Sequence, residues 1–372
     1  MGGRVHVVGA GLAGLAAAVG LVAAGRETVV HELAPQAGGR CRSYFEPALG
    51  LTIDNGNHLL LSANRAALSF LKTIGSEGKL AVGDEAAFAF ADLATGERWV
   101  LRPNRGRVPW WIFSRRRRVP STHAIDYLSV RRLLHPRRDA SIADLMQCDG
   151  PLYHRLWRPL FLAALNTEPS EASAFLAGSV LRETLARGGS ACRPLIALGG
   201  LGPAFIDPAL SYLERHGATI RFRHQLRQLV LADDVIRALD FGTDAISLAP
   251  GDAVILAVPA PVAPLLLPEL SVPKTFHAIV NVHFKHTPPQ TLPTIIGIIN
   301  GTAEWLFAFP DRISATISAA DQWIGTPREA LAEEVWKDVV KLTNLPETLP
   351  TWHVIRERRA TFAALPEENE NR

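Results

Sequence analysis

Val5-His6-Val7-Val8-Gly9-Ala10-Gly11-Leu12-Ala13-Gly14 is the stretch that decides the fold. Its apolar start predicts a buried parallel strand over 5–8, and the Ala- and Leu-rich residues that follow predict a helix over 12–24. In such a turn Gly9 permits the tight bend, Gly11 lets a pyrophosphate approach the backbone, and Gly14 lets helix and strand pack closely. The helix N-terminus offers unpaired N–H groups and the positive end of a dipole to the phosphates. This stretch therefore predicts a dinucleotide site formed by Gly9, Ala10, Gly11, Leu12, Ala13 and Gly14.

The next strand supplies the context that such a glycine pattern needs. Gly25 ends the helix, residues 27–32 predict a strand, and Glu32 closes that strand roughly 20 residues after the glycines. A carboxylate at this position can accept hydrogen bonds from a ribose hydroxyl. The alternative is a glycine-rich turn in some other α/β protein, but strand, helix, strand and acid in this order favour the dinucleotide site.

A glycine pair and an arginine, Gly38-Gly39-Arg40, follow shortly after Glu32. The glycines let the backbone pass close to a cofactor, and the guanidinium can pair with a phosphate through two hydrogen bonds. An ordinary surface turn is the alternative, which the short distance from Glu32 disfavours. The order glycine turn, acid, Gly-Gly-Arg is typical of flavin binders rather than nicotinamide binders.

Size and composition indicate a globular protein of two domains. The chain has 372 residues, of which 48% are hydrophobic and 20% charged, with a net charge of +3. Its three cysteines are odd in number and widely spaced, which favours a reducing, cytoplasmic compartment and predicts neither a disulfide scaffold nor a metal site. The longest apolar stretch, 253–267, contains three prolines, so we expect no membrane-spanning helix.

Beyond residue 64 the pattern alternates between helices and strands. We expect amphipathic helices over 153–201 that line an apolar cleft, since they carry much apolar surface; helices that merely pack in a core are the alternative. The other predicted elements are a helix over 65–75, a hairpin of strands 88–92 and 98–101, strands over 219–222, 228–231, 235–239, 253–258, 278–284 and 303–309, and a helix over 328–342.

An aromatic cluster, 108–113, precedes a run of four arginines, 115–118. Between residues 102 and 138 we count eleven arginines against one acid, Asp126. Aromatic side chains beside cations suit a surface that rests on anionic lipid headgroups. A solvated face explains the charges equally well, and nucleic acid would attract the same charges. Our hypothesis is peripheral contact with the inner face of an anionic membrane, and no nucleic-acid partner.

Two further segments carry a resemblance to a known family. Residues 5–43 resemble the FAD-binding start of the flavin amine oxidase and phytoene desaturase superfamily. Asp54-Asn55-Gly56-Asn57-His58 followed by leucines, and Pro159-Leu160 through Asn166-Thr167, resemble the hydroxysqualene dehydroxylase branch. The resemblance implies an α/β fold: a discontinuous Rossmann-type FAD-binding domain, 1–63 and 201–265, with an inserted α+β substrate domain, 64–200 and 266–372.

The same resemblance implies a chemistry and a set of site residues. Reduced FAD would replace the hydroxyl of hydroxysqualene by hydride and yield squalene for hopanoid synthesis, in an apolar pocket with an acid for the departing hydroxyl. His58 is the candidate acid, because histidine titrates near neutral pH. Asp54 is the second candidate, either to orient the histidine or to bond the flavin; a structural hydrogen bond within the turn is the alternative role for both. Gly56 and Asn57 would lie beside the flavin ring, and Val230 would present its backbone to the adenine.

Two other functions stay open on the sequence alone. Another FAD enzyme of the same fold, a polyene desaturase or an amine oxidase, would share these motifs, although an amine oxidase needs an aromatic cage and the chain has only four tyrosines. A non-catalytic relative that serves as an interaction partner is the third. Such flavoproteins usually close with a Gly-Asp pair and a last helix, and we expect that closing segment to be absent from the 372 residues.

Overall fold

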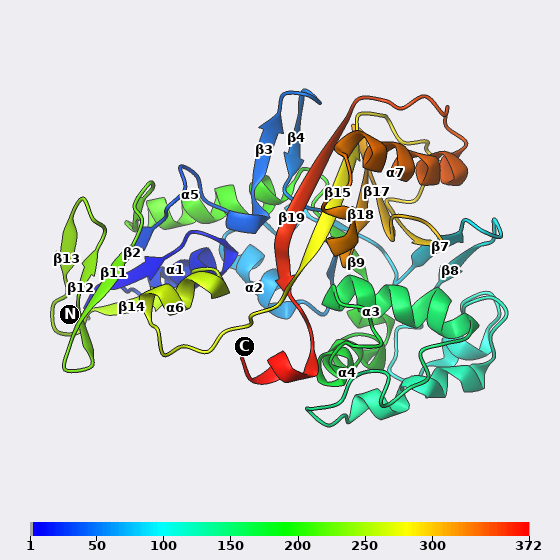
Figure 1. The fold of residues 1–372 in the computed structure, drawn as a ribbon, viewed down its shortest axis with the longest axis horizontal. Coiled ribbons are helices and arrows are strands. Elements are labelled where there is room, and N and C mark those ends of the chain that lie inside the picture. Colours follow the sequence, from blue (N-terminus) through cyan, green and yellow to red (C-terminus); the bar gives the residue numbers. More distant parts are fainter. Residues whose placement is uncertain (1–2, 372) are drawn as a thin grey trace.

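The computed structural model describes residues 3–371, and two sheets dominate it (Figure 1). The first is a four-stranded parallel sheet with the strand order β10-β2-β1-β14. Its strands and its first helix are β1 (Val5–Val8), α1 (Leu12–Ala23), β2 (Thr28–His31), β10 (Thr219–Arg221) and β14 (Ala253–Leu256). The predicted strand at 5–8 and the predicted helix at 12–24 are confirmed, and the strand at 27–32 is one residue shorter at each end.

The two central strands of this parallel sheet, β1 and β2, are buried along their whole length. Val7 and Val30 have no exposed surface, and neither does Leu15 on the face of α1 that packs against them. The helix α5 (Asp207–Arg215) packs beside α1 and adds Leu213 to the same core. Side chains of α1 and α5 thus cover one face of β1, and on the other face Val8 packs with Leu229 and Leu239. This packing fixes the glycine turn at the carboxyl end of the strand.

The Rossmann-type sheet is discontinuous in sequence, as expected. Strand β10 pairs with β2, and β14 pairs with β1, although nearly two hundred residues separate β2 from β10. The core of this sheet also includes Leu71 of α2 (Arg65–Thr73) and Leu195 of β9 (Pro194–Ile196), which the sequence placed in the substrate domain. The domain boundaries after residues 63, 200 and 265 stay predictions.

The second sheet is mixed and has seven strands in the order β19-β15-β18-β17-β16-β7-β8. Strand β7 pairs in parallel with β16, which joins the early and late parts of the predicted substrate domain in one sheet. Its strands are β7 (Phe88–Asp92), β8 (Arg98–Leu101), β15 (Phe276–Phe284), β16 (Ile295–Ile299), β17 (Trp305–Phe309), β18 (Arg312–Ile317) and β19 (Trp352–Phe362). The predicted hairpin 88–101 is confirmed.

Helices cover both faces of this sheet. On one face α7 (Arg328–Thr343) buries Leu331, Val335 and Trp336 against the strands, where the sequence predicted a helix. On the other face lies a helical layer, seen at the lower right of Figure 1. It consists of η3 (Trp110–Phe113), η4 (Ala124–Leu134), the π-helical turn η5 (Tyr153–Trp157), α3 (Arg158–Leu165) and α4 (Ala174–Glu183). Neither η3 nor η4 was predicted from the sequence.

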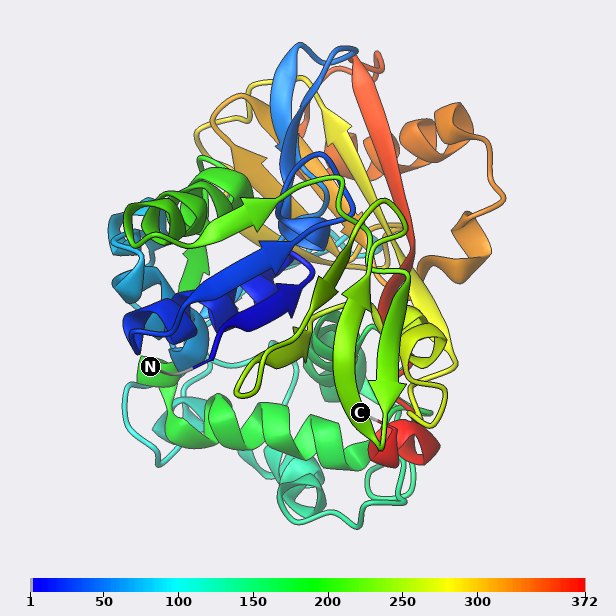
Figure 2. The ribbon, with the colours of Figure 1, turned by 90° about the vertical axis from the view of Figure 1, so that its left-hand side faces the viewer.

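Shorter elements connect these layers. Figure 2, in which the Rossmann-type sheet faces the viewer, shows the antiparallel sheet β11-β12-β13 beside it. The remaining strands are β3 (Ser43–Glu46), β4 (Leu51–Asp54), β5 (Leu60–Leu61), β6 (Ala81–Val82), β11 (Gln228–Ala232), β12 (Val235–Asp240) and β13 (Ala245–Ser247). The remaining helical turns are η1 (Gly39–Cys41), η2 (Glu77–Lys79), η6 (Leu185–Arg187), η7 (Gly189–Ala191), η8 (Gly202–Ile206), η9 (Ala260–Val262), α6 (Ala263–Leu266), η10 (Ala320–Trp323) and η11 (Pro366–Glu370).

Within residues 3–371, none of the helices combines the length and the apolar character that a bilayer crossing requires.

Candidate active site

The turn between β1 and α1 has the geometry of a phosphate site. Gly9 has φ +107°, and a Cβ at Gly14 would lie 1.8 Å from the carbonyl oxygen of Gly9, so neither position accepts a side chain. A Cβ at Gly11 would meet nothing within 4 Å, so the space in front of that residue is open. The first turn of α1 carries no capping side chain and no acid. Its N–H groups are therefore available to an anion such as a diphosphate.

Glu32 lies directly beside this turn. Its Oε2 accepts a hydrogen bond from the N–H of Ala10 at 2.6 Å, and its Oε1 accepts one from the N–H of Ala34 at 2.8 Å. A carboxylate oxygen has a second lone pair, so both oxygens can still accept from ribose hydroxyls. The structure thus brings Glu32 to the glycine turn, as the spacing predicts.

The second glycine pair packs against the first turn. The N–H of Gly38 donates to the carbonyl of Ala10 at 2.8 Å, and a Cβ at Gly39 would lie 3.4 Å from the Cα of Gly11. Val230 is exposed on β11, next to Leu229, which packs against Val8 at the end of β1. All the predicted cofactor residues up to Gly39 meet at this turn; the role of Val230 stays a prediction.

Arg40 leads from the glycine turn to a cavity. Its Nη1 donates to the carbonyl of Ala360 on β19, and its side chain lines the cavity wall. We predicted a phosphate partner for this guanidinium. Arg40 lies between the glycine turn and the cavity, since it directly follows Gly39 and lines the cavity wall. Its role as a phosphate ligand stays a prediction.

The cavity has a volume of about 410 Å³ and lies between the helical layer and the seven-stranded sheet. Most of its wall is apolar. The apolar side chains come from both layers and include Leu59, Leu61, Phe88, Phe90, Leu101, Leu156, Leu160, Ala163, Ala164, Val180, Leu185, Ile279, Ile295, Trp305 and Phe307. The predicted apolar cleft lined by helices 153–201 is therefore present, although the sheet supplies as much of the lining as the helices do.

Polar groups also line the cavity, and hydrogen bonds tie them to one another. The Nδ2 of Asn57 donates to Ser314 Oγ at 2.7 Å and to Thr316 Oγ1 at 2.9 Å, which fixes the 55–58 turn on the sheet. The Nδ2 of Asn55 donates to Glu357 Oε2 on β19 at 3.3 Å. A Cβ at Gly56 would lie 3.3 Å from Asn281 Nδ2, so this glycine lets the turn approach β15 closely.

His58 follows this turn and lines the cavity. Its Nδ1 lies 3.0 Å from the carbonyl oxygen of Gly56. Because a carbonyl only accepts, Nδ1 carries the proton, and Nε2 is the nitrogen that can take up or release a second one. Within residues 3–371 no hydrogen-bond partner engages this Nε2.

Asp54 has a different environment from His58. It is buried, and its Oδ1 accepts hydrogen bonds from Ser43 Oγ at 2.5 Å and from the N–H of Leu201 at 2.8 Å. It does not line the cavity, and burial raises the pKa of this carboxyl above its usual range. These contacts join β3, β4 and the loop before η8, so they favour the structural alternative over a role on the flavin.

Comparison with known proteins identifies the family. The profile of the flavin-containing amine oxidoreductases matches residues 12–371. A hydroxysqualene dehydroxylase of Rhodopseudomonas palustris is 50% identical over 370 residues, which cover 99% of this chain and 88% of that protein. A second hydroxysqualene dehydroxylase, from Sinorhizobium fredii, is 48% identical and covers 98% of this chain and 88% of its own length. The chain belongs to the hydroxysqualene dehydroxylase family.

The fold agrees with this family assignment. Cyclohexylamine oxidase from Brevibacterium oxydans has the same fold, with a TM-score of 0.69 at 16% identity, over 100% of this chain and 90% of that one. The chain is a flavin-containing oxidoreductase, and FAD is its cofactor. The glycine turn fits FAD because it offers open space at Gly11, free N–H groups on α1 and the carboxylate of Glu32.

Several polar residues of the candidate site were not predicted from the sequence. Asn281, Thr316, Ser318 and Glu357 line the cavity from β15, β18, the residue after β18, and β19. Asn281 had a visible signal, a polar residue in the middle of the apolar run 278–284. Thr316, Ser318 and Glu357 had none, since their strands were not predicted or were only partly predicted.

Glu304 is a second protonatable group close to the cavity wall. Its Oε2 accepts a hydrogen bond from the N–H of Ser318 at 2.8 Å. Burial raises the pKa of Glu304 to about 7, which makes it partly protonated at neutral pH. Within residues 3–371 no cluster of three or more histidine, cysteine or acidic side chains is arranged to hold a metal ion.

Proposed function

We propose that this protein reduces hydroxysqualene to squalene and releases the hydroxyl as water, as a step of hopanoid synthesis. The observation that carries the proposal is the cavity: an apolar wall and, beside His58, a set of hydrogen-bonded polar groups. Such a cavity suits a long isoprenoid with a single hydroxyl. The names of the curated relatives support the same substrate.

The apolar wall performs two tasks in this reaction. Side chains such as Leu160, Trp305 and Phe307 bind the isoprenoid arms, since each apolar group removed from water contributes to affinity. They also exclude water from the carbon that loses the hydroxyl. Water there would return the hydroxyl to the carbon and undo the reaction.

His58 supplies the proton for the departing hydroxyl. Its Nε2 gives the proton, while its Nδ1–H stays on the carbonyl of Gly56, which fixes the orientation of the ring. Bound in its reduced form, FAD supplies the hydride that takes the place of the hydroxyl. The hydroxyl and the proton together leave as water, so the atoms and charges of the step balance.

The residues of the glycine turn hold the cofactor in this proposal. Gly9, Gly11, Gly14 and the N–H groups of α1 would bind the phosphates, and Glu32 would bind the ribose. Gly38, Gly39 and Arg40 lead from that turn to the cavity, and Gly56 and Asn57 form the part of the wall proposed for the flavin ring.

The decisive experiment incubates the purified, flavin-loaded protein with a chemical reductant and hydroxysqualene without oxygen. Mass spectrometry should find squalene when the flavin is reduced and none when it is oxidised. A yellow protein that makes no squalene would overturn the proposal and favour a polyene desaturase or an amine oxidase. A protein that binds no flavin would favour the non-catalytic interaction partner.

The amine oxidase alternative has little support in the cavity. Such an enzyme needs an aromatic cage over the flavin, and among the described residues no tyrosine lines this cavity. The phenylalanines and Trp305 of the wall lie among aliphatic side chains, which suits an isoprenoid better than an amine.

We infer further that the enzyme works in the cytoplasm, on the inner face of the membrane. All three cysteines are free, which suits a reducing compartment. An isoprenoid such as hydroxysqualene dissolves in lipid, so an enzyme that consumes it gains from peripheral contact with a bilayer.

A further inference from the structure

The turn η3 exposes two large aromatic side chains. Trp110 is 67% exposed and Phe113 is 65% exposed, whereas Trp111 and Ile112 between them are buried. Residues three apart eclipse one another in a 3-10 helix, so the two exposed rings stand together, with centroids 6.2 Å apart. Trp111 and Ile112 therefore anchor the turn in the core, and Trp110 and Phe113 face the solvent.

The helix η4 repeats this arrangement with aliphatic side chains. Ile125 is 68% exposed and Leu128 is 50% exposed, three residues apart, while Tyr127 is buried. The ring of Trp111 packs edge-on against that of Tyr127 at 5.0 Å, which joins η3 to η4. In Figure 1 this part of the helical layer, coloured cyan to green, lies at the lower right, and the Rossmann-type sheet lies at the left.

Cations surround these exposed apolar side chains. Between residues 102 and 138 there are eleven arginines, and within the described part of the chain only Arg102 and Arg137 of these pair with a carboxylate. The rest are free to meet anions from outside. Exposed apolar side chains among unpaired arginines complement an interface that is apolar inside and anionic outside.

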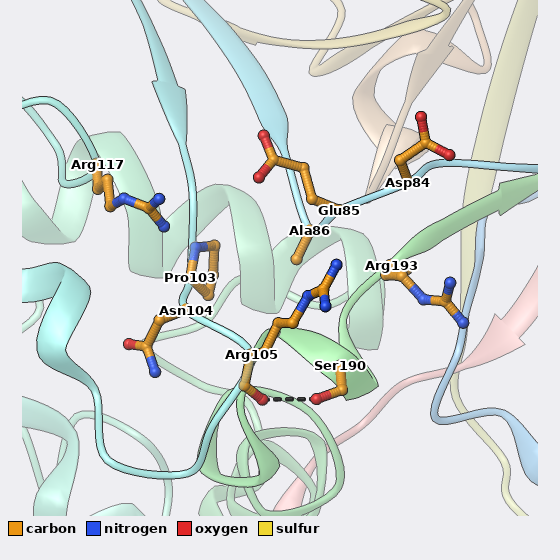
Figure 3. Close-up of a pocket in the computed structure, with 10 residues that line it drawn as sticks. Asp84, Glu85, Ala86, Pro103, Asn104, Arg105, Arg117, Ser190 and Arg193 are labelled. Carbon is orange, nitrogen blue, oxygen red and sulfur yellow. Dashed lines mark hydrogen bonds between the residues drawn. The ribbon is translucent and has the colours of Figure 1, made fainter.

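An arginine-lined pocket adjoins the aromatic turn (Figure 3). It has a volume of about 590 Å³ and is lined by Arg105, Arg117 and Arg193, with Asp84 and Glu85 on the side opposite Ser190. Of the two acids, Glu85 is already paired with Arg102.

Asn104 makes the pocket and the aromatic turn one unit. It lines the pocket, its Oδ1 accepts from the N–H of Trp111 at 3.1 Å, and its Nδ2 donates to the carbonyl of Val108 at 2.9 Å. The carbonyl of Asn104 also accepts from the N–H of Gly189 at 2.7 Å, which closes the pocket floor. A ligand in the pocket would therefore lie against Asn104, the residue that holds the aromatic turn in place.

We propose that η3, η4 and this pocket form a docking surface for an anionic phospholipid bilayer. Trp110, Phe113, Ile125 and Leu128 enter the interfacial region, and the pocket arginines bind the phosphate of a lipid headgroup. Guanidinium groups bind phosphate through paired hydrogen bonds, and aromatic rings favour the headgroup level of a bilayer. Nucleic acid would use the arginines but would leave Ile125 and Leu128 exposed to water.

The docking surface lies behind the wall of the active-site cavity. Phe90, Leu101 and Leu156 line the cavity and belong to the same core cluster as Trp111 and Tyr127. One continuous hydrophobic core thus connects the proposed bilayer contact with the proposed isoprenoid site. This deepens the proposed function, on which it rests for the reason to dock: the substrate resides in the bilayer.

Vesicle flotation of the flavin-loaded protein, without substrate, tests the surface. Wild type should float with vesicles that contain phosphatidylglycerol, less so as salt rises, and should not float with pure phosphatidylcholine. Trp110→Ala with Phe113→Ala should lower the partition coefficient roughly tenfold. Replacing Arg105, Arg117 and Arg193 by glutamine should lower it about fivefold for each arginine.

Two matched variants serve as controls. Leu265→Ala removes an apolar side chain that is exposed elsewhere, and Arg215→Gln removes an exposed arginine on α5; neither should change flotation. Equal flotation of wild type and the docking variants would overturn the proposal. So would binding of inorganic phosphate or RNA by a protein that does not float with anionic vesicles.

An activity measurement separates this proposal from the proposed function. With hydroxysqualene in detergent, Trp110→Ala with Phe113→Ala should turn over like wild type, because the cavity is unchanged. With hydroxysqualene embedded in anionic vesicles, the variant should be roughly tenfold slower. Equal rates of the variant and wild type on vesicles would overturn the docking surface. If wild type floats with anionic vesicles but forms no squalene, only the proposed substrate is overturned.

Discussion

The Nδ1 of His58 donates a hydrogen bond to the carbonyl oxygen of Gly56, 3.0 Å away. Because Nδ1 is engaged by this hydrogen bond, Nε2 is the ring nitrogen that can exchange a proton with a molecule in the cavity. The Gly56 peptide belongs to the 55–58 turn that Asn57 fixes on the sheet through Ser314 and Thr316. The orientation of the imidazole is therefore set by the backbone of the same turn that forms part of the cavity wall.

Replacing His58 by alanine should remove the proton donor. We expect kcat to fall by about two to four orders of magnitude, as for loss of a general acid, with little change in KM or in flavin content. Anaerobic single-turnover measurements of squalene formation would check this. His216→Ala, on an exposed histidine at the end of α5, is the control and should behave like wild type. If His58→Ala keeps full kcat, Glu304 becomes the candidate acid.

Asp54 should affect stability rather than chemistry. Asp54→Ala leaves the buried N–H of Leu201 without its acceptor, which should lower the free energy of unfolding by about 2–4 kcal/mol. Asp54→Asn keeps a carbonyl oxygen for Leu201 and should lose less. Thermal melts and kcat per bound flavin would be measured together. A stable Asp54→Asn protein with an activity loss as large as that of His58→Ala would restore Asp54 to the chemistry.

Gly11 and Gly20 offer a matched pair on the cofactor helix. In both positions an added Cβ meets nothing within 4 Å. Gly20→Ala should therefore stabilise the helix by about 0.5–1 kcal/mol and leave flavin binding unchanged. Gly11→Ala should fold equally well but place a methyl group where the diphosphate approaches, which costs about 1–3 kcal/mol, or roughly tenfold to a hundredfold in the Kd of FAD.

Flavin titration of the two purified variants would decide this prediction. The comparison controls for the added methyl group, because Gly11 directly precedes α1, Gly20 lies within it, and an added Cβ meets nothing within 4 Å at either position. Equal Kd values for Gly11→Ala and Gly20→Ala would place the diphosphate elsewhere on the protein.

The geometry of the glycine turn was predictable from sequence because its residues are close in sequence and sterically constrained. Gly9, Gly14 and Gly39 lie where a side chain would strain or crowd the backbone, and Glu32 ends the strand next to the turn. Such requirements leave a pattern at fixed spacing. The helix over 12–24, the hairpin over 88–101 and the helix over 328–342 were predictable for the same reason: each is set by its own periodicity.

The polar part of the cavity was not predictable because it forms from distant strands. Asn57 meets Thr316, and Asn55 meets Glu357, across more than two hundred residues of sequence. The parallel pairing of β7 with β16 has no local signal either. The helices η3 and η4 were not predicted because 3-10 turns repeat every three residues, which does not match the α-helical period of about 3.6.

Filling the cavity should block the substrate and spare the cofactor. Ala164 lines the cavity from α3, and Ala164→Phe would occupy volume proposed for an isoprenoid arm. We expect kcat/KM for hydroxysqualene to fall roughly tenfold or more, since overpacking costs at least about 1–3 kcal/mol. Flavin content should not change. Leu265→Phe at an exposed position is the control, and unchanged kcat/KM in Ala164→Phe would place the substrate outside this cavity.

A chain of three histidines should make the stability of the Rossmann-type sheet depend on pH. His6 Nδ1 lies 3.0 Å from His31 Nε2, and His31 Nδ1 lies 2.8 Å from His224 Nδ1. His224 Nε2 lies 3.0 Å from the carboxylate of Asp244, which only accepts. With all three rings neutral, His6 donates to His31, His31 donates to His224, and His224 donates to Asp244. A second proton on His31 would break this order.

Burial, followed by the neighbouring His6, lowers the pKa of His31 to about 3 from a usual value near 6.5. Above pH 6.5 both the folded and the unfolded chain hold this ring neutral, so its contribution to stability is complete. Below pH 6.5 the unfolded chain takes up a proton that the folded chain refuses until about pH 3. The free energy of unfolding should therefore fall as the pH drops, by about 1.4 kcal/mol per pH unit for this residue.

His31→Gln tests this linkage, because an amide can still donate to His224 and accept from His6 but does not titrate. We expect the variant to lose stability less steeply than wild type in denaturant melts between pH 6.5 and pH 4.5. Some slope should remain, since burial also lowers the pKa of His283, to about 3. His216→Gln, at an exposed histidine, should keep the slope of wild type. Parallel pH profiles for His31→Gln and wild type would mean that His31 is protonated in the folded protein, contrary to its burial.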